Sequence, residues 1–572
     1  MTENRNIILA VVLSALVLLG WTMLSDRFLP AAPQTHKVEK GTVEPSPNPQ
    51  AGSVQATGPQ APQKIQGREQ VLAQTPRVQI RTPSLQGSIN LRGARFDDLV
   101  LVKERQTIAR NSPPVRLLSP AGAPGAYFAT FGWSGQGIQL PASDTQWTAS
   151  SPVLRPGSPV TLSWANGSGQ TFQMVVSIDE NYLFSVRQRV QNGGSAPVEI
   201  RPYGLVSRAE KSADSTSWTM HVGPIGYLDG AAEYGIDWKD IDGGQAKRFA
   251  SDGGWLGFTD KYWLTALAPV DSPRIAASFT GTPGGGFQAD YAQAPQIVPP
   301  GGASQTDTRL FAGAKEKTLL DNYEEAGIPK LSKAIDWGWF EWFMRPIFDL
   351  LNWLFHATGN FGVAIIGLTV IVRLIMFPVA QKQFKSMAAM RKVQPKLKSI
   401  QERFKSDRAK QQQEMLKLYQ EEKINPAAGC LPIVLQVPVF YALYKVLLVS
   451  VEMRHQPFAL WIRDLSAPDP LTPVNLFGLL NFTPPTFLHI GVLALLLGIT
   501  QWLSFKLNPQ QMDPTQQQIF SLMPWVMMFI LSPFAAGLLL YWVTNNILTV
   551  LQQWWLYRRF GLHFSDTHPV HS

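Results

Sequence analysis

The stretch GLTVIVRLIMFPVA, residues 367–380, is almost entirely apolar but contains one cation, Arg373. No acidic residue occurs in this stretch, so the arginine has no counter-ion nearby along the chain. An arginine near the centre of a membrane-spanning helix costs about 2.5–3.5 kcal/mol on insertion scales. Two interpretations are open. The side chain snorkels to the nearer membrane surface, or it faces a polar surface that several membrane helices share.

Hydrophobic runs at both ends of the chain predict six membrane-spanning helices. The first run, residues 7–24, is about as long as a helix that crosses the hydrocarbon layer. Asp26, Arg27 and Pro30 follow it in place of a small-residue cleavage site, which favours an uncleaved anchor over a signal peptide. The other predicted spans are residues 354–379, 431–451, 487–505, 519–531 and 538–556.

The positions of the basic residues predict the orientation of these spans. Residues 381–423 contain 12 basic and 5 acidic residues, whereas residues 452–485 contain only Arg454 and Arg463 as basic residues. Because Lys and Arg collect in cytoplasmic loops, the first segment is expected inside the cell and the second outside. Six spans then place both termini in the cytoplasm and residues 26–350 on the outer side.

The whole-chain composition excludes several classes of protein. The chain has 572 residues, a net charge of +9 and a mean hydropathy of −0.03, an average that hides the apolar ends. A single cysteine, Cys430, excludes an intramolecular disulfide framework and a cysteine-rich metal site. The outer region contains no P-loop, no H-E-x-x-H and no G-x-S-x-G motif. We therefore expect no enzyme, no cofactor and no metal.

The outer region is predicted to be a flexible linker followed by an antiparallel β-sandwich. Residues 26–76 begin with a segment rich in Pro, Gln, Ala, Ser and Gly, which is typical of a tether. In YLFSVRQRV, Phe184, Val186 and Val190 alternate with polar residues, as in a half-buried strand. The pair Asn166-Gly167 between two strand-like runs predicts a hairpin. Many short strands with frequent turns favour a large sandwich.

Three features of this region allow a ligand-binding interpretation and a structural one. TPGGGF, residues 282–287, resembles a nucleotide loop, but no helix start follows, so a turn is favoured. Trp238 and Trp255 lie in turns that suit a sugar or a peptide, although core packing is the commoner role of tryptophan. His221 is the only histidine between the tether and the membrane-proximal segment.

Two amphipathic segments flank the second predicted span. Residues 333–352 carry tryptophans among charged residues, which favours a helix in the membrane interface over an extension of the next span. Residues 381–428 are predicted to form a basic helical hairpin with a turn at 406–410. Its apolar seam would contain Phe384, Met387, Leu397, Ile400, Phe404, Met415, Leu418 and Tyr419. The candidate docking residues are Lys382, Lys385, Arg391, Lys392, Lys396 and Lys398.

The cations of this hairpin have two interpretations. They are suited to docking on ribosomal RNA or on lipid phosphate. Alternatively, they only follow the positive-inside rule.

Polar residues in the other spans favour the shared-surface interpretation of Arg373. Thr369 is one helical turn before Arg373, on the same face. One or more polar or amphipathic residues occur in each of three further spans. They are Gln436, Gln501, Trp542 and Asn545. Because no carboxylate is present in these spans, we expect water in a cavity to solvate the charge of Arg373.

Three stretches carry a resemblance to a known family. NPAAGCLPIVLQVPVFYALY (425–444), VEMRHQPFALWIRDLSAPDP (451–470) and the Arg373 segment resemble the YidC family of membrane protein insertases. The resemblance implies a groove open to the cytoplasm and to lipid but closed on the outer side, with five of the six membrane helices forming the core. The groove arginine of the family matches Arg373, its threonine matches Thr369, and its aromatic on the last span matches Trp542.

The resemblance also implies a function and partners. The chain is expected to insert and help fold nascent inner-membrane proteins, alone or with the Sec translocon. The implied partners are nascent chains, the signal recognition particle, the ribosome and the lipid bilayer, without sequence-specific nucleic-acid binding. The implied location is the bacterial inner membrane, with the large domain in the periplasm.

Two other functions stay open. One is a small-solute transporter with Arg373 as an anion site, although no convincing internal repeat is present. The other is an envelope-assembly protein that acts through its sandwich. The predicted organisation is an anchor (1–25), a linker (26–76), a β-sandwich domain (77–332), an interfacial helix (333–352), the second membrane helix (353–380), the hairpin (381–428), membrane helices three to six (429–557) and a cytoplasmic tail (558–572).

Overall fold

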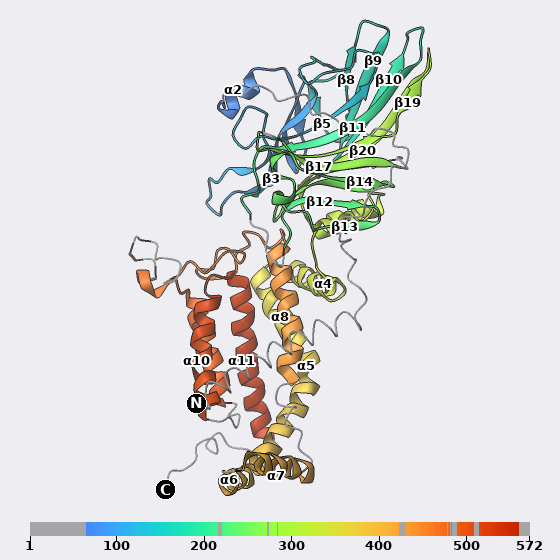
Figure 1. The fold of residues 1–572 in the computed structure, drawn as a ribbon. Coiled ribbons are helices and arrows are strands. Elements are labelled where there is room, and N and C mark those ends of the chain that lie inside the picture. Colours follow the sequence, from blue (N-terminus) through green and yellow to red (C-terminus); the bar gives the residue numbers. More distant parts are fainter. Residues whose placement is uncertain are drawn as a thin grey trace. The chain divides into compact units, whose positions relative to one another are not determined.

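The computed structural model describes residues 65–214, 220–270, 274–282, 284–405, 407–422, 431–477, 479–480, 482, 489–507 and 514–559. The predicted anchor, most of the linker, Cys430 and the C-terminal tail beyond Arg559 lie outside these residues. The described chain divides into two compact units, one made mainly of strands up to Trp339 and one made mainly of helices from Phe340 onward (Figure 1).

The strand unit contains two large sheets, which agrees with the predicted sandwich. In the first sheet, of eleven strands, all neighbours are antiparallel except β1 and β7. Its order is β14 (Ala246–Ser251), β17 (Ile275–Gly281), β18 (Phe287–Gln293), β11 (Val198–Arg208), β5 (Tyr127–Gly135), β3 (Arg95–Arg105), β2 (Leu85–Asn90), β1 (Arg77–Arg81) and β7 (Val153–Leu154), with β19 (Gln296–Val298) beside β11 and β4 (Pro114–Leu118) beside β3.

The second sheet has nine strands, and all its neighbours are antiparallel. Its order is β13 (Ala231–Glu233), β12 (Gly223–Leu228), β15 (Trp255–Thr259), β16 (Trp263–Val270), β20 (Ala303–Ala314), β10 (Leu183–Asn192), β9 (Gln170–Ile178), β8 (Val160–Ala165) and β6 (Thr148–Ala149). The unit also contains α2 (Arg68–Ala73), α3 (Lys317–Glu325) and the short 3-10 helices η1 (Trp238–Asp240), η2 (Asp242–Gly244) and η3 (Leu331–Ala334).

Both local predictions for the strands are confirmed. Phe184, Val186 and Val190 of β10 are completely buried, as their alternation predicts. Gln188 shares their inward direction, and its Nε2 atom donates a 2.8 Å hydrogen bond to the carbonyl oxygen of Gly132, whereas its Oε1 atom is buried without a hydrogen-bond partner among the described residues. Asn166-Gly167 lies in the turn between β8 and β9, where Gly167 has a φ of 74° that favours glycine.

The structural interpretation also holds for the three ambiguous features. The described residues of this stretch connect β17 and β18, and the Thr282 N–H donates a hydrogen bond to the Gly286 carbonyl oxygen. Trp255 is completely buried, and Trp238 stacks on Phe258 at 5.5 Å between ring centroids. The His221 ring is buried, and its Nε2 atom lies 2.7 Å from the carbonyl oxygen of Pro224.

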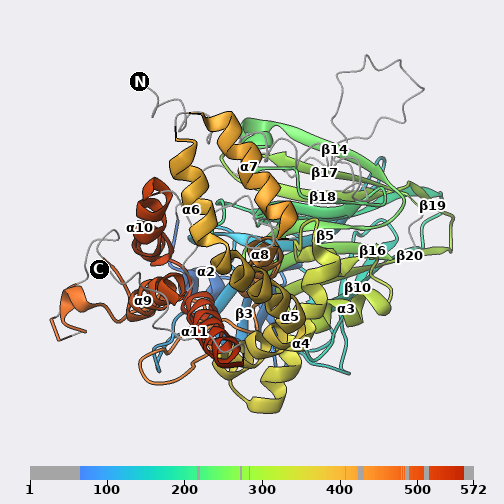
Figure 2. The same ribbon diagram turned by 90° about the horizontal axis from the view of Figure 1, so that it is seen from below.

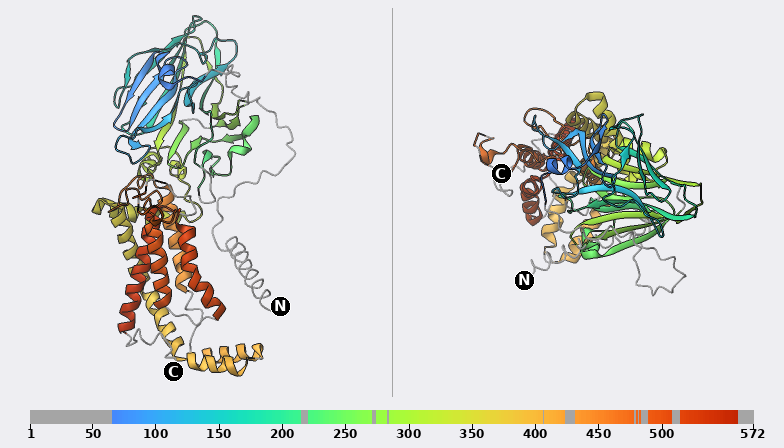
Figure 3. Two further views of the ribbon diagram at one scale, coloured as in Figure 1. Left: turned by 90° about the vertical axis from the view of Figure 1, so that its left-hand side faces the viewer. Right: turned by 90° about the horizontal axis from the view of Figure 1, so that it is seen from above.

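The helical unit contains eight described α-helices. They are α4 (Glu341–Thr358), α5 (Phe361–Lys392), α6 (Gln394–Arg403), α7 (Arg408–Glu421), α8 (Leu431–Val449), α9 (Val492–Leu507), α10 (Pro514–Leu531) and α11 (Ala536–Arg559), with the 3-10 helix η5 (Pro473–Asn475) between α8 and α9. α11 packs against α5, α8 and α9, and α10 packs against α9. The red helices of Figure 3 show this arrangement of α9, α10 and α11.

The helix at the position of the second predicted span differs from the prediction at both ends. The expected span began at residue 354, but α4 continues to Thr358 and α5 begins at Phe361. Gly359 causes this break because its φ of 68° ends α4, and its N–H bonds the carbonyl oxygen of Phe355. At the other end α5 does not stop near residue 380. It continues without a break to Lys392.

Among the described residues, only Phe361–Lys382 is a helical segment both long and apolar enough to cross a membrane. Gln436–Val449, Val492–Lys506 and Ser521–Leu531 are shorter apolar helical segments. α4 is amphipathic, as predicted, with Met344 and Leu351 buried and Trp342 and Trp353 more than 60% exposed. Trp337, by contrast, is a buried residue of the strand unit and lies before this helix begins.

The predicted hairpin is formed by α6 and α7, which lie side by side in Figure 2. Val393, Leu397 and Leu418 are buried between them, and Ile400, Met415 and Tyr419 pack partly against this cluster. Five residues of the predicted seam are therefore confirmed. Phe384 and Met387 belong to α5 instead, because that helix extends to Lys392. The connection between α6 and α7 begins at Phe404, slightly before the predicted turn.

Candidate functional site

Arg373 projects from α5 toward α11. Its Nε atom donates to Asn545 Oδ1 at 2.8 Å, and its Nη2 atom donates to Thr549 Oγ1 at 2.6 Å and to the Asn545 carbonyl oxygen at 3.3 Å. The sequence predicted a guanidinium solvated by water, whereas the structure provides three neutral acceptors of the protein. None of them carries a negative charge, so the positive charge of Arg373 is held in place without being neutralised.

The position of Arg373 does not favour snorkelling. The apolar segment continues to Lys382, nine residues further along α5. At 1.5 Å per residue this is about 13 Å along the helix axis, deeper than expected from a span that ends near Pro378. The guanidinium is instead bound to the neighbouring helix. Leu374 and Ile375, the next two residues of α5, are 66% and 71% exposed, so the cation lies beside an apolar surface.

The two residues of α11 that accept from Arg373 are also hydrogen-bonded to each other. Asn545 and Thr549 are one turn apart and share a face of the helix. The Thr549 hydroxyl donates to the Asn545 carbonyl oxygen at 2.6 Å, which leaves its oxygen lone pairs free to accept from Arg373. Asn545 was a predicted site residue and is 7% exposed. Thr549 was not predicted, although its spacing of four from Asn545 was a usable signal.

α8 joins α11 through a second polar contact. The Gln436 Nε2 atom donates to the Tyr541 hydroxyl at 2.5 Å, and Tyr541 is 2% exposed. One residue further along α11, the Trp542 ring packs against Phe440 with ring centroids 4.6 Å apart. Gln436 and Trp542 were both predicted, but the hydroxyl of Tyr541 was missed because a buried tyrosine is usually part of the core.

α9 joins α11 through a third contact. The Asn546 Nδ2 atom donates to Gln501 Oε1 at 3.0 Å and to Thr500 Oγ1 at 3.2 Å. Gln501, one of the predicted groove residues, is therefore hydrogen-bonded to Asn546 of α11. We call the polar residues joined through α11 the polar seam. It consists of Arg373, Gln436, Thr500, Gln501, Tyr541, Asn545, Asn546 and Thr549.

Thr369 is not a member of the polar seam. Its hydroxyl donates to the carbonyl oxygen of Ile365 in its own helix at 2.6 Å, and the residue is 1% exposed. This internal hydrogen bond satisfies a threonine in an apolar helix. The predicted shared face with Arg373 therefore does not produce a hydrogen-bonded contact between the two side chains.

The predicted docking residues are divided between two helices. Lys382, Lys385, Arg391 and Lys392 belong to the end of α5, while Lys396 and Lys398 belong to α6. Lys396 is exposed and pairs with Glu422 at 2.7 Å, which ties α6 to the end of α7. Among the described residues, no group of three or more His, Cys, Asp or Glu side chains is placed to hold a metal ion.

Comparison with known proteins identifies the family of this chain. It is 45% identical to the membrane protein insertase YidC of Zymomonas mobilis over 562 residues, which covers 97% of this chain and 96% of the relative. The chain belongs to the YidC family of membrane protein insertases. The YidC insertase of Bradyrhizobium diazoefficiens is 44% identical over 603 residues, covering 98% of this chain and 97% of that one.

Two YidC family regions cover most of the chain. Residues 77–350 match the YidC periplasmic domain, and residues 353–562 match the 60Kd inner membrane protein family. The chain is therefore an inner-membrane protein with a periplasmic β-sandwich, and its family is one of insertases rather than enzymes. A solved structure of an active YidC insertase, 19% identical in sequence, covers 83% of this chain and 92% of its own length with a TM-score of 0.35.

Proposed function

We propose that this chain inserts hydrophobic segments of nascent proteins into the inner membrane through the polar seam, without using a nucleotide. The observation that carries the proposal is the environment of Arg373. A full positive charge lies in the longest apolar helix of the described chain, and its partners on α11 are all neutral. Such an intramembrane cation is a functional site by default, because it is costly to keep there.

Arg373 would attract acidic residues in the hydrophilic tail that precedes or follows a substrate helix. The amides and hydroxyls of the seam would solvate this tail transiently as it crosses. The exposed Leu374 and Ile375 offer an apolar surface along which the substrate helix can slide into lipid. Burial of that helix supplies the driving force, at about 25 cal/mol per Å² of apolar surface. The membrane potential adds about 2.3 kcal/mol per charge per 100 mV for an acidic tail.

We further propose that α5, α8, α9, α10 and α11 are membrane spans and that residues 7–24 form a sixth. The apolar part of α10, Ser521–Leu531, is short, so the bilayer beside it would have to be thin. A thin bilayer lowers the barrier that the substrate tail must cross. The excess of basic residues in residues 381–423 and at Arg558 and Arg559 supports cytoplasmic positions for the hairpin and the C-terminus.

The proposed partners are nascent membrane proteins, the Sec translocon, the ribosome and the signal recognition particle. The exposed α6–α7 hairpin supports a docking role because its many cations suit the phosphates of ribosomal RNA. The resemblance to YidC proteins supports the other partners.

Reconstitution tests the proposal. Purified protein in liposomes is given a single-span substrate with an acidic tail, in the absence of nucleotide, and protease protection of the tail measures insertion. We expect insertion well above that of protein-free liposomes. Insertion at the lipid background contradicts the proposal, and selective flux of a small anion through the same liposomes would favour the transporter alternative.

A further inference from the structure

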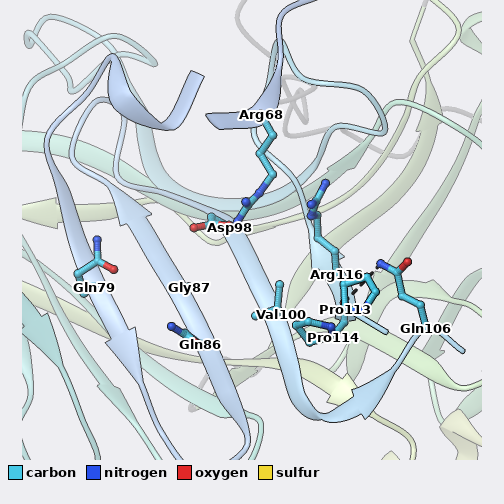
Figure 4. Close-up of a pocket in the computed structure, with 10 residues that line it drawn as sticks. All are labelled: Arg68, Gln79, Gln86, Gly87, Asp98, Val100, Gln106, Pro113, Pro114 and Arg116. Atoms are coloured by element: carbon cyan, nitrogen blue, oxygen red, sulfur yellow. Dashed lines mark hydrogen bonds and ion pairs between the residues drawn. The ribbon is translucent and has the colours of Figure 1, made fainter. Parts of the chain in front are cut away.

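A polar pocket and an apolar loop are surface features that the proposed insertion function does not use. The pocket has a volume of about 570 Å³ and lies on the first sheet (Figure 4). Its carboxylate, Asp98, accepts a hydrogen bond from Arg68 and attracts Arg116, so contacts within the domain account for these charges. The loop belongs to the helical unit, and its large apolar side chains are exposed.

This loop lies in the connection between α8 and α9. Residues 471–488 contain no Asp, Glu, Lys or Arg. Five described residues of this stretch are large and apolar, and between 45% and 84% of each is exposed. We call them the apolar tip, and they are Leu476, Phe477, Leu479, Leu480 and Phe482. An exposed apolar patch on a protein marks a surface that contacts a membrane, a ligand or another protein.

The exposure of the apolar tip is not a general property of the connection. In the preceding half, Met453, Ile462 and Leu465 are buried, and among the described large apolar residues of that half only Leu460 is exposed. The Leu465 carbonyl oxygen accepts a 2.9 Å hydrogen bond from the Gly537 N–H, which fixes this half to the start of α11. The chain therefore packs the first half of the connection against the protein and leaves the tip uncovered.

The backbone of the apolar tip is folded on itself. Three of its N–H groups donate to nearby carbonyl oxygens at 2.9–3.0 Å, from Leu476 to Pro473, from Phe477 to Thr472 and from Leu480 to Asn475. The Leu479 N–H donates to the Leu476 carbonyl oxygen at 3.3 Å. In lipid, backbone polar groups have to be hydrogen-bonded within the protein. A tip with internally bonded N–H groups and apolar side chains meets this requirement.

The loop begins and ends beside the first turn of α9. The Val492 N–H donates to the Leu471 carbonyl oxygen at 3.0 Å, and the Leu493 N–H donates to Asp469 Oδ2 at 2.8 Å. Asp469 is buried, and its Oδ1 atom accepts from the Leu471 N–H at 3.0 Å. The loop, in orange, extends sideways from the helices, beyond α10 in Figure 1 and beyond α9 in Figure 2.

We infer that the apolar tip inserts into the outer leaflet of the bilayer beside α9, without crossing the membrane. The inference rests on the proposed function and its membrane topology, which place the start of α9 at the outer surface. An exposed apolar face of α9, formed by Leu496, Ile499 and Leu503, follows the loop along the chain. The lipid that covers this face is then also the apolar phase into which the uncharged tip transfers from water.

Spin labels in the full-length protein test this inference. In a Cys430→Ser background, a nitroxide is attached at Leu479→Cys in the tip, at Ile499→Cys in α9 or at Ile297→Cys in β19, and each protein is placed in liposomes. Ile297 is the matched control because it is an apolar residue of the strand unit with 73% exposure, against 84% for Leu479. Collision rates with oxygen, which concentrates in lipid, and with a water-soluble nickel complex report the surroundings of each label.

We expect the label at position 479 to collide mainly with oxygen, at a depth of about 5–10 Å below the headgroups. The label at position 297 should collide mainly with nickel. Equal nickel collision rates at both positions would overturn the inference. Few collisions with either reagent at position 479 would also overturn it, because protein, such as a second copy of the chain, would then cover the tip.

The label at position 499 separates this inference from the proposed topology on which it rests. A lipid environment at 499 together with water at 479 would overturn the inference alone. Water at both positions would overturn the topology as well.

A charge in the apolar tip provides a second test. In protein labelled at Phe482→Cys, Leu479→Glu should raise the nickel collision rate several-fold, because a carboxylate is costly to transfer into lipid. Leu479→Met has a similar volume and no charge, and it should leave the rate unchanged. Equal rates for these two variants would contradict insertion of the tip.

Discussion

The Nε atom of Arg373 on α5 donates a 2.8 Å hydrogen bond to the side-chain oxygen of Asn545 on α11. This contact joins two residues that are 172 positions apart in the sequence, and Thr549 reinforces it one turn further along α11. The same arginine thus has two separable roles. It fastens α5 to α11, and it keeps a positive charge beside the exposed apolar residues of α5. Substitutions at Asn545 and Arg373 separate the two roles.

The first prediction concerns the fastening role. Asn545→Leu removes the Oδ1 acceptor of Arg373, and Arg373→Leu removes the donor. Hydrogen bonds between membrane helices contribute about 0.6 kcal/mol on average and up to about 1.7 kcal/mol. We expect a coupling free energy in this range from the two single variants and the double variant, measured by steric-trap unfolding in bicelles. Strictly additive free energies of unfolding would show that the contact does not couple the two helices.

A second prediction concerns His221 of the sandwich. Burial lowers the pKa of this ring from its ordinary value, so the unfolded chain takes up a proton at a higher pH than the folded chain does. The stability associated with the neutral ring is complete above about pH 6.5 and is lost as the pH falls through the folded pKa. Tryptophan fluorescence during urea unfolding should show a steeper loss of stability below pH 6.5 for the native chain than for His221→Gln. Parallel pH profiles would contradict this.

In the α6–α7 hairpin, the effect of core packing on stability can be measured separately from the effect of surface charge on ribosome binding. Leu418 is buried in the seam of the hairpin, so Leu418→Ala should destabilise the pair by about 2 kcal/mol. Lys396 is exposed, and Lys396→Gln should leave the hairpin folded while it weakens the binding of ribosomes at low salt. Hydrogen exchange of α6 and α7, together with ribosome co-sedimentation, measures the two effects. If Lys396→Gln and a matched Gln411→Ala variant bind ribosomes equally, this lysine takes no part in docking.

Removal of most of the sandwich tests where the insertion function lies. A variant in which residues 86–328 are replaced by a flexible linker keeps every residue of the polar seam. We expect it to retain insertion of a single-span substrate within about threefold of the full chain in the same liposome assay. Complete loss of insertion, in protein that still reaches the membrane, would favour a function that acts through the sandwich.

The sequence supported some features of the fold well and others poorly. Strand β10 could be predicted because Phe184, Val186 and Val190 alternate along it, and the alternation follows from the two faces of a sheet. The break at Gly359 was missed although glycine at the end of a helix is a known stop signal. The apolar residues on both sides of it, Leu354 and Phe361, made two helices look like one continuous span.

The residues of the candidate site could be predicted from the sequence, but most of their contacts could not. Arg373, Gln436, Gln501, Trp542 and Asn545 were predicted because polar or amphipathic groups in apolar spans are costly and conspicuous. Their partners were not predictable, because a pairing depends on the rotation of each helix about its axis, which packing sets. Thr369 illustrates the limit. It shares a face with Arg373, but its hydroxyl bonds its own helix.

The central claim is that the charge of Arg373 selects and draws in acidic tails, and one measurement tests it directly. Insertion into liposomes is measured for two substrates that differ only in tail charge, acidic or neutral, with the native chain, Arg373→Lys and Arg373→Ala. We predict that the native chain and Arg373→Lys favour the acidic tail. In Arg373→Ala, the ratio of the insertion rates of the acidic-tailed and neutral-tailed substrates should fall five- to tenfold, which corresponds to about 1–1.4 kcal/mol of activation free energy. This variant should still insert the neutral-tailed substrate. The same preference for the acidic tail in all three proteins would contradict the account.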